Sequence, residues 1–184
     1  NRLTFRDIEK TNIELEKVLS EFFDYQRKEG FKLSLDEFFE YKHDYLYGKM
    51  TGENLVSIDD IKFLFSLKGK LKEIIKSNDI ECIWAHGDLN TGNIFLTEDE
   101  KVYIIDWEYF GIRHQSYDRF VYSRNLRHAK LPDEYHLIMN SPEVSVLDVL
   151  EEFIFSMVNG KCDMELDAIK LKYCRNALIV RLGE

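Results

Sequence analysis

Apolar side chains recur at intervals of three and four residues through most of this chain, a spacing that is typical of amphipathic helices. The pattern predicts helices at residues 3–28, 35–47, 117–128, 133–140, 143–158 and 164–182, with another that starts at residue 58. The middle of the chain differs, because residues 81–84, 93–96 and 101–105 form short apolar runs flanked by charged turn residues. Such runs predict short strands. We therefore expect a mainly α fold with a small β-hairpin, of the α+β class.

Polar residues at the ends of these segments indicate where several helices begin or end. Ser34 followed by Glu37 has the spacing of a capping box, in which each side chain accepts a hydrogen bond from the other residue's backbone N–H. Ser57 is a cap for the helix that starts at residue 58. The other boundary signals are the pair Asn78 and Asp79, which should end that helix, and Pro132 and Pro142, which fit helix starts.

Composition limits the class of protein. With 184 residues, 45% of them hydrophobic and 14% aromatic, the chain can form one globular domain spanning 1–184. A formal net charge of −9 argues against a nucleic-acid partner. No apolar run approaches the length of a membrane span, no signal peptide is recognisable, and the three cysteines form no C-x-x-C pair. We expect a cytoplasmic protein with no membrane partner.

The predicted hairpin brings two oxygen-bearing side chains together. If residues 94–96 pair antiparallel with 101–105, Asn93 just before the first strand lies beside Asp106 just after the second. An amide oxygen and a carboxylate are suited to Mg²⁺, which usually takes few protein ligands and completes its octahedron with waters and substrate phosphates. The spacing therefore predicts a site for a metal-bound nucleotide.

A third acidic residue precedes the hairpin. Asp88 lies in a loop with Gly87 and Gly92, whose backbone freedom lets the chain fold tightly over a ligand. Phosphoryl transfer needs little more than a carboxylate that orients and deprotonates a hydroxyl, together with metal ions that neutralise the phosphates. Each of these residues alone would be an ordinary turn former or strand-end cap, so their joint spacing carries the prediction.

The stretch HGDLNTGNI at residues 86–94, followed by the aspartate of IIDWE, resembles the catalytic and metal-binding motifs of the aminoglycoside phosphotransferase and choline kinase superfamily. The resemblance implies that Asp88 is the catalytic base, that Asn93 and Asp106 bind Mg²⁺ and with it the nucleotide, and that His86 supports the loop. In this superfamily an aspartate that follows a tyrosine soon after the second motif braces the catalytic loop, and Asp118 fits that place. Four fixed positions at this spacing should occur by chance on the order of once per thousand chains.

The resemblance also implies a fold, the C-terminal lobe of a protein-kinase-like structure. Its parts would be a catalytic loop at 84–93, a metal-binding hairpin at 93–108 and a helical substrate-side subdomain at 116–184. The phosphoryl donor would be ATP or GTP, with Mg²⁺, and the acceptor a hydroxyl of a small molecule. No G-x-G-x-x-G occurs in the chain. We therefore expect that the N-terminal lobe is absent, either because it has been cut away from the natural protein or because this is a natural short form. The start at Asn1 favours the first alternative, in which the missing N-terminal lobe is a partner of this chain. In both cases the isolated 184 residues should turn over ATP slowly.

Two features bear on the acceptor, which the resemblance leaves open among aminoglycosides, choline-like amino alcohols and sugars. Residues 141–167 carry one base, Lys161, and seven acids, namely Glu143, Asp148, Glu151, Glu152, Asp163, Glu165 and Asp167. Such a field would attract a cationic amine. Because Glu151 and Glu152 are adjacent and cannot both point into one cleft, a solvated helix face is the favoured interpretation.

The second feature is aromatic. Trp107, Tyr109 and Phe110 follow the metal motif directly, and aromatic rings can enclose a quaternary ammonium group. Packing is the commoner role for such residues and is the favoured interpretation. A kinase-like module that binds or scaffolds without catalysis is the alternative to an enzyme, and turnover distinguishes the two.

Overall fold

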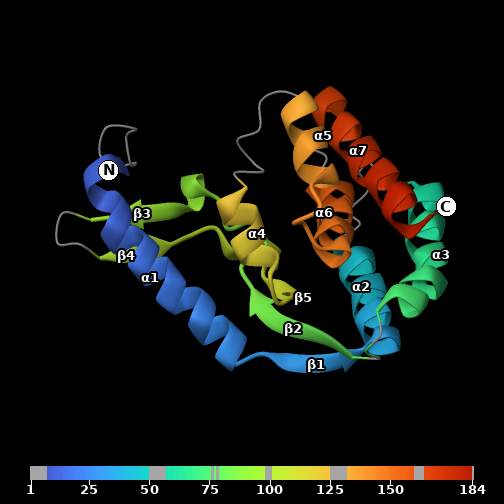
Figure 1. Ribbon diagram of the computed structural model, residues 1–184, viewed down its shortest axis with the longest axis horizontal. Helices are drawn as coiled ribbons and strands as arrows, with labels where there is room; N and C mark the ends of the chain where they lie inside the picture. The colour runs from blue at the N-terminus through green and yellow to red at the C-terminus, as the bar shows by residue number, and fades with distance from the viewer. Residues whose placement is uncertain are drawn as a thin grey trace. The chain divides into compact units, whose positions relative to one another are not determined.

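The computed structural model describes residues 8–49, 57–75, 77, 79–97, 101–124, 132–159 and 164–183. The chain forms two compact units (Figure 1). Unit 1 contains residues 1–31 and 82–128, and unit 2 contains residues 32–81 and 129–184. The predicted mainly α fold with a small β-hairpin is confirmed. That 1–184 form one domain stays a prediction.

Unit 1 carries the predicted hairpin and the motif residues. Its elements are helix α1 (Ile8–Lys28), most of strand β2 (Asp79–Ala85), the 3₁₀ turn η1 (Thr91–Asn93), strands β3 (Ile94–Leu96) and β4 (Val102–Ile104), the 3₁₀ turn η2 (Trp107–Tyr109), strand β5 (Gly111–His114) and helix α4 (Tyr117–Ser123). Strands β3 and β4 pair antiparallel, with Ile94 opposite Ile104 and Phe95 opposite Tyr103. The predicted hairpin is thus confirmed, while residues 98–100 of its turn lie outside the described residues.

The core of unit 1 joins helix α1 to both halves of the motif. Leu15 and Leu19 of α1 are buried with Leu89 from the candidate catalytic loop and Ile94 from the hairpin. Partly buried apolar side chains complete this cluster, namely Phe22, Phe23, Val102, Ile104 and Tyr122. Burial of each large apolar side chain contributes about 1.5–3 kcal/mol. One helix therefore supports the candidate catalytic loop and the hairpin together.

A second, three-stranded sheet was not predicted. Its order is β1-β2-β5, where β1 is Phe31–Ser34. Strand β2 pairs antiparallel with β5, with Cys82 opposite His114 and Ala85 opposite Gly111. Strands β1 and β5 have only four residues each. Phe31 and Leu33 alternate with polar residues in β1, but so short a pattern does not specify a strand, and the pairing depends on partners that are remote in sequence. Strand β2 also begins at Asp79, so the assignment of Asp79 to a helix end was wrong, and Asn78 lies outside the described residues.

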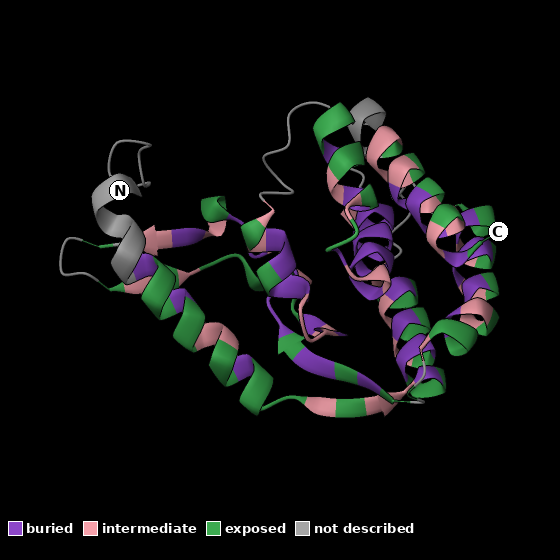
Figure 2. Cartoon of the chain, viewed as in Figure 1, coloured by how far each residue is buried: buried purple, intermediate pink, exposed green. Residues whose placement is uncertain are grey.

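Unit 2 is helical. It contains α2 (Leu35–Lys49), α3 (Ile58–Ile74), α5 (Pro132–Asn140), α6 (Val146–Asn159) and α7 (Met164–Leu182). Helix α7 packs against α3, α5 and α6, and α2 packs against α3 and α6. Figure 2 shows α6 buried along nearly its whole length, in keeping with the run of buried residues from Leu147 to Val158. Among the described helices none combines the length and the apolar character that crossing a membrane requires.

The predicted helix starts are mostly confirmed. The Glu37 carboxylate accepts from the Ser34 N–H at 2.8 Å while the Glu37 N–H donates to the Ser34 hydroxyl at 3.2 Å, which is the capping box. Ser57 likewise caps α3, and Pro132 begins α5. The assignment of Pro142 to a helix start was wrong, because Pro142 lies in a turn and α6 begins only at Val146.

Candidate functional site

The candidate catalytic loop leaves strand β2 at His86 and ends where η1 meets strand β3. Gly87 has a φ of +85°, which turns the chain sharply, and Asp88 follows it, half-buried. Asn90 then caps η1 by accepting a hydrogen bond from the Gly92 N–H at 2.8 Å. The buried Leu89 anchors the loop in the core of unit 1. Asp88 is therefore held between a turn and a cap, with its neighbour fixed in the core.

The hairpin register puts Asn93 and Asp106 at the same end of the two strands. The Ile105 N–H donates to the Asn93 carbonyl at 2.9 Å, one residue beyond the last ladder pair, and Asp106 comes next. Asp106 has a φ of +66°. Among the residues that the structure describes, no other non-glycine residue has a positive φ. Its exposed side chain makes no capping hydrogen bond to η2. Aspartate tolerates this left-handed conformation better than most residues, but at a cost in strain that is common at functional sites.

The Asn93 side chain faces Asp88. Its amide nitrogen Nδ2 donates to the Asp88 carbonyl at 2.9 Å and lies 3.4 Å from the Asp88 carboxylate oxygen Oδ2. Because the donor end of the amide is engaged by Asp88, the oxygen Oδ1 is the end suited to a metal ion. The structure thus brings Asp88 and Asn93 together through their side chains, and Asn93 and Asp106 through the backbone of the hairpin.

This donor set fits Mg²⁺ in the chemistry of its atoms. An amide oxygen and an exposed carboxylate are hard ligands, and two protein ligands leave room for waters and phosphates. Over the residues that the structure describes, no group of three or more His, Cys, Asp or Glu side chains could enclose a metal. The residues thus match an open site shared with a substrate better than a closed structural site.

His86 connects the loop to the hairpin. Its ring is buried, with Nε2 2.7 Å from the Ile105 carbonyl and Nδ1 3.2 Å from the Asp88 N–H. The carbonyl can only accept and the N–H can only donate, so the neutral ring carries its proton on Nε2. The indole of Trp107 lies against this ring, with centroids 4.7 Å apart. His86 therefore fixes the backbone of Asp88 relative to the residue that precedes Asp106.

Asp118 binds the root of the same loop. One of its carboxylate oxygens accepts from the His86 N–H at 2.7 Å and the other from the Gly87 N–H at 2.9 Å. The residue is fully buried at the first turn of α4, and burial raises the pKa of its carboxyl. Hydrogen bonds from Gln26, Gly87 and His86 oppose that rise in pKa.

Gln26 is a member of this network that sequence reasoning missed. It continues the apolar stripe of α1 through Leu15, Leu19 and Phe22, yet it is polar. A glutamine at a position that helical spacing assigns to the buried face is a signal, because buried polar groups are normally hydrogen-bonded to something specific. The partner itself could not be read from the sequence.

The Gly87 position gives a first testable prediction. A Cβ added at Gly87 would lie against the Tyr109 carbonyl group, 2.9 Å from its carbon, and Gly87 also has positive φ. We expect Gly87→Ala to destabilise unit 1 by roughly 1–3 kcal/mol and to displace Asp88. Thermal and urea unfolding measure the first effect.

Gly69→Ala is the matched control. Gly69 lies within α3, and nothing stands within 4 Å of an added Cβ. Since alanine favours helix, this variant should be more stable by about 0.5–1 kcal/mol. If Gly87→Ala behaved like Gly69→Ala, the tight approach of the loop to η2 would be refuted.

The aromatic residues after the metal motif pack on one another yet remain exposed. Phe110 stacks on Trp84 with centroids 5.4 Å apart, and Trp107 lies 5.8 Å from Phe110. Side-chain exposure is 43% for Trp107, 46% for Phe110 and 52% for Trp84. Packing therefore covers only part of each ring. The alternative role of these rings, a cage for an ammonium group, stays a prediction.

The favoured interpretation of the acidic segment 141–167 was a solvated helix face. This interpretation was wrong for the helical residues of the segment that the structure describes. Asp148, Glu151 and Glu152 of α6 are all buried. The Glu151 carboxylate accepts from the Lys42 ammonium at 2.7 Å, and Glu152 accepts from the Tyr135 hydroxyl at 2.8 Å. Glu143 is exposed, and the side chains of Asp163, Glu165 and Asp167 lie outside the described residues.

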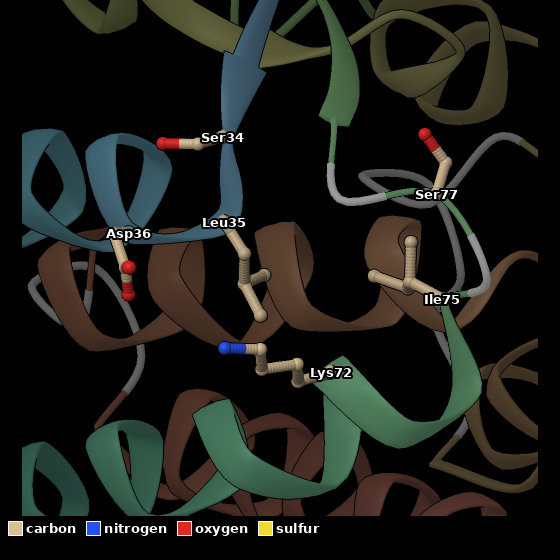
Figure 3. Close-up of a pocket in the computed structure, with 6 residues that line it drawn as sticks. All are labelled: Ser34, Leu35, Asp36, Lys72, Ile75 and Ser77. Carbon is tan, nitrogen blue, oxygen red and sulfur yellow. The ribbon is translucent and has the colours of Figure 1, made fainter.

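A shallow pocket of about 250 Å³ lies in unit 2, away from the motif residues in sequence. It is lined by Ser34, Leu35, Asp36, Lys72, Ile75 and Ser77, which Figure 3 draws as sticks. The Lys68 ammonium lies 2.5 Å from the Asp36 carboxylate, and this hydrogen bond and charge lower the pKa of Asp36. None of the predicted site residues lines this pocket.

Comparison with known proteins agrees with the motif. Residues 64–153 match the model of the phosphotransferase enzyme family. No curated protein matches the chain. The chain is similar to the choline kinase LicA from Streptococcus pneumoniae, with 12% identity, a TM-score of 0.47, and coverage of 76% of this chain and 54% of that one. It is also similar to a choline/ethanolamine kinase family protein from Mesorhizobium loti, with 14% identity, a TM-score of 0.43, and coverage of 83% and 59% respectively. The chain thus covers less than two thirds of either structure. The match of residues 64–153 to the family model confirms the predicted resemblance to phosphotransferases.

Proposed function

We propose that this chain, whose residues 64–153 match the model of the phosphotransferase enzyme family, is the catalytic C-terminal lobe of a small-molecule kinase. The observation that carries the proposal is the position of Asn93. Its side chain binds Asp88, while its backbone binds the residue before Asp106. Asn93, one of the two proposed metal ligands, thereby links the proposed base to the other ligand, and phosphoryl transfer depends on such joint positioning of base and metal.

The proposed reaction moves the γ-phosphoryl group of ATP or GTP to an alcohol. The Asp88 carboxylate orients the acceptor hydroxyl and takes its proton as the oxygen bonds to the γ-phosphorus. The bond between that phosphorus and the β,γ-bridging oxygen breaks, and the nucleoside diphosphate leaves with the electron pair. Mg²⁺, when held by Asn93 and Asp106, would neutralise charge on the phosphates.

The rest of the network holds Asp88 in place. The His86 ring accepts a hydrogen bond from the Asp88 N–H, and the Asn93 amide donates one to the Asp88 carbonyl. Both backbone groups of Asp88 are thus hydrogen-bonded. Such preorganisation lowers the barrier because the carboxylate does not have to be ordered during the reaction. His86 and Asp118 are accordingly proposed as supporting residues, with no direct part in proton transfer.

The acceptor belongs to the class of small-molecule alcohols, with aminoglycosides, choline-like amino alcohols and sugars as candidates. A cationic acceptor has less support than the count of acids suggested, because Glu151 is paired with Lys42 inside unit 2. The exposed rings of Trp84, Trp107 and Phe110 lie in the unit that carries the motif and are the feature that favours an ammonium group.

The test uses the full-length protein. With Mg²⁺ and a panel of alcohols, we expect nucleotide consumption that depends on the acceptor and that falls at least about a hundredfold in Asp106→Ala, since loss of one preorganised electrostatic partner has effects of this size. Asp44→Ala, an exposed position in α2, is the control and should keep full turnover. Absence of turnover with every acceptor would instead favour a binding or scaffold module.

A further inference from the structure

Gln26 occupies an unusual place for an uncharged polar side chain. It lies in the last turns of α1 and is only 8% exposed. Its partners come from distant parts of the sequence within unit 1, 58 and 92 residues away. A polar group buried at this depth needs specific hydrogen bonds.

Both partners of Gln26 adjoin the candidate catalytic loop. Its amide nitrogen donates to the Asp118 carboxylate at 2.8 Å and to the Trp84 carbonyl at 3.2 Å. Each partner is an acceptor, so the orientation of the amide is determined, since a flipped amide would point its oxygen at a carboxylate. Trp84 is in strand β2, two residues before His86. Helix α1 is thereby joined to the start of the loop and to Asp118.

The Asp118 carboxylate in turn receives three donors. The Gln26 amide and the His86 N–H share oxygen Oδ2, and the Gly87 N–H donates to Oδ1. An ionised carboxylate can accept all three hydrogen bonds, whereas a protonated one would replace an acceptor with an O–H donor. The arrangement therefore depends on an ionised Asp118 with both oxygens correctly oriented.

We propose that Gln26 is a positioning residue for phosphoryl transfer, which holds the Asp118 carboxylate in the orientation that fixes the backbone of the loop bearing Asp88. The effect of Gln26 on catalysis rests on the proposed function, in which Asp88 is the base. Gln26 acts through Asp118 and does not contact the reacting groups.

A purely structural role fits Gln26 less well. Its amide oxygen Oε1 is buried, and none of the residues that the structure describes donates a hydrogen bond to it, which is unfavourable for stability. An apolar side chain of similar shape would avoid that buried acceptor. The glutamine is explained by what its nitrogen does for Asp118, and its hydrogen bond is the largest of the effects that oppose the rise in the pKa of Asp118 on burial.

The test compares Gln26→Met with Phe23→Leu, both on α1. Phe23 packs on the unit 1 core without a hydrogen bond to the loop, so its variant reports on weakened packing alone. In Gln26→Met the pKa of Asp118 should rise further, because the strongest opposing hydrogen bond is lost while burial remains. The acid limb of kcat/KM should therefore move to higher pH, and kcat should fall roughly ten- to hundredfold with little change in KM for the nucleotide. Phe23→Leu should keep the acid limb of the wild type.

A second measurement does not depend on turnover. Hydrogen exchange at the His86 and Gly87 amides should be about fivefold faster or more in Gln26→Met than in wild type, with little change in Phe23→Leu. An unmoved acid limb, or unchanged protection of these two amides, would overturn the role of Gln26. Wild-type protein without turnover on any acceptor would overturn the proposed function, and amide protection would still decide whether Gln26 holds the loop.

Discussion

Replacing Asp88 with asparagine is expected to lower kcat by roughly 10²–10⁴-fold while nucleotide affinity stays nearly unchanged. The substitution keeps the size and shape of the side chain but removes its capacity to take a proton. The backbone groups of residue 88 would keep their hydrogen bonds to His86 and Asn93. The loss should therefore fall on the transition state, where the hydroxyl is deprotonated.

Steady-state kinetics with the best acceptor, together with calorimetric titration of the nucleotide, would measure the two quantities separately. Asp106→Ala provides the contrast, because loss of a proposed metal ligand should weaken the binding of Mg²⁺-nucleotide as well as turnover. Asp44→Asn is the matched control for removal of one negative charge at an exposed site. Normal kcat in Asp88→Asn would remove Asp88 from the role of base.

The local geometry of the site could be predicted from the sequence because it depends on short-range pairing. Once the apolar runs 94–96 and 102–104 pair as strands around a short turn, their register places Asn93 near Asp106 without any knowledge of the rest of the chain. The Ser34 and Glu37 capping box is local in the same sense. Features of this kind are encoded within a few residues.

Features that depend on distant partners could not be predicted. Strands β1 and β5 have four residues each, too few for a pattern that specifies a strand, and both pair with β2, which lies between them. The positive φ of Asp106 leaves no trace in composition, since aspartate is common in many conformations. Gln26 could be suspected as a polar residue on an apolar stripe, but its bond to Asp118 spans 92 residues.

The acidic segment shows how a pattern can mislead. Adjacent glutamates on a helix point about 100° apart, so at least one of them is usually expected to be solvated. In α6 both are buried, because the neighbouring elements provide a partner for each. Lys42 comes from α2, 109 residues before Glu151, and Tyr135 comes from α5, 17 residues before Glu152. Charge counted along a sequence therefore overstates the field that remains for a cationic acceptor.

Replacing Lys42 with methionine is expected to destabilise the protein by about 3–5 kcal/mol, the usual cost of removing one partner from a buried ion pair. The Lys42 ammonium and the Glu151 carboxylate are 2.7 Å apart, and both side chains have no solvent exposure. The ammonium also lies 4.7 Å from the centre of the Phe38 ring. Methionine fills much of the same volume but leaves a buried carboxylate without its counter-charge. Urea unfolding of the purified variants measures the loss.

Two further variants separate charge from packing. Lys42→Met combined with Glu151→Leu removes both charges and should regain most of the lost stability, because paired buried charges contribute little beyond an apolar pair of similar volume. Lys68→Met, at the solvent-exposed pair with Asp36, should have a much smaller effect. If the double variant were as unstable as Lys42→Met, the loss would come from packing. If Lys42→Met were as stable as Lys68→Met, Glu151 would not depend on Lys42, and its charge would again be available to attract a cationic acceptor.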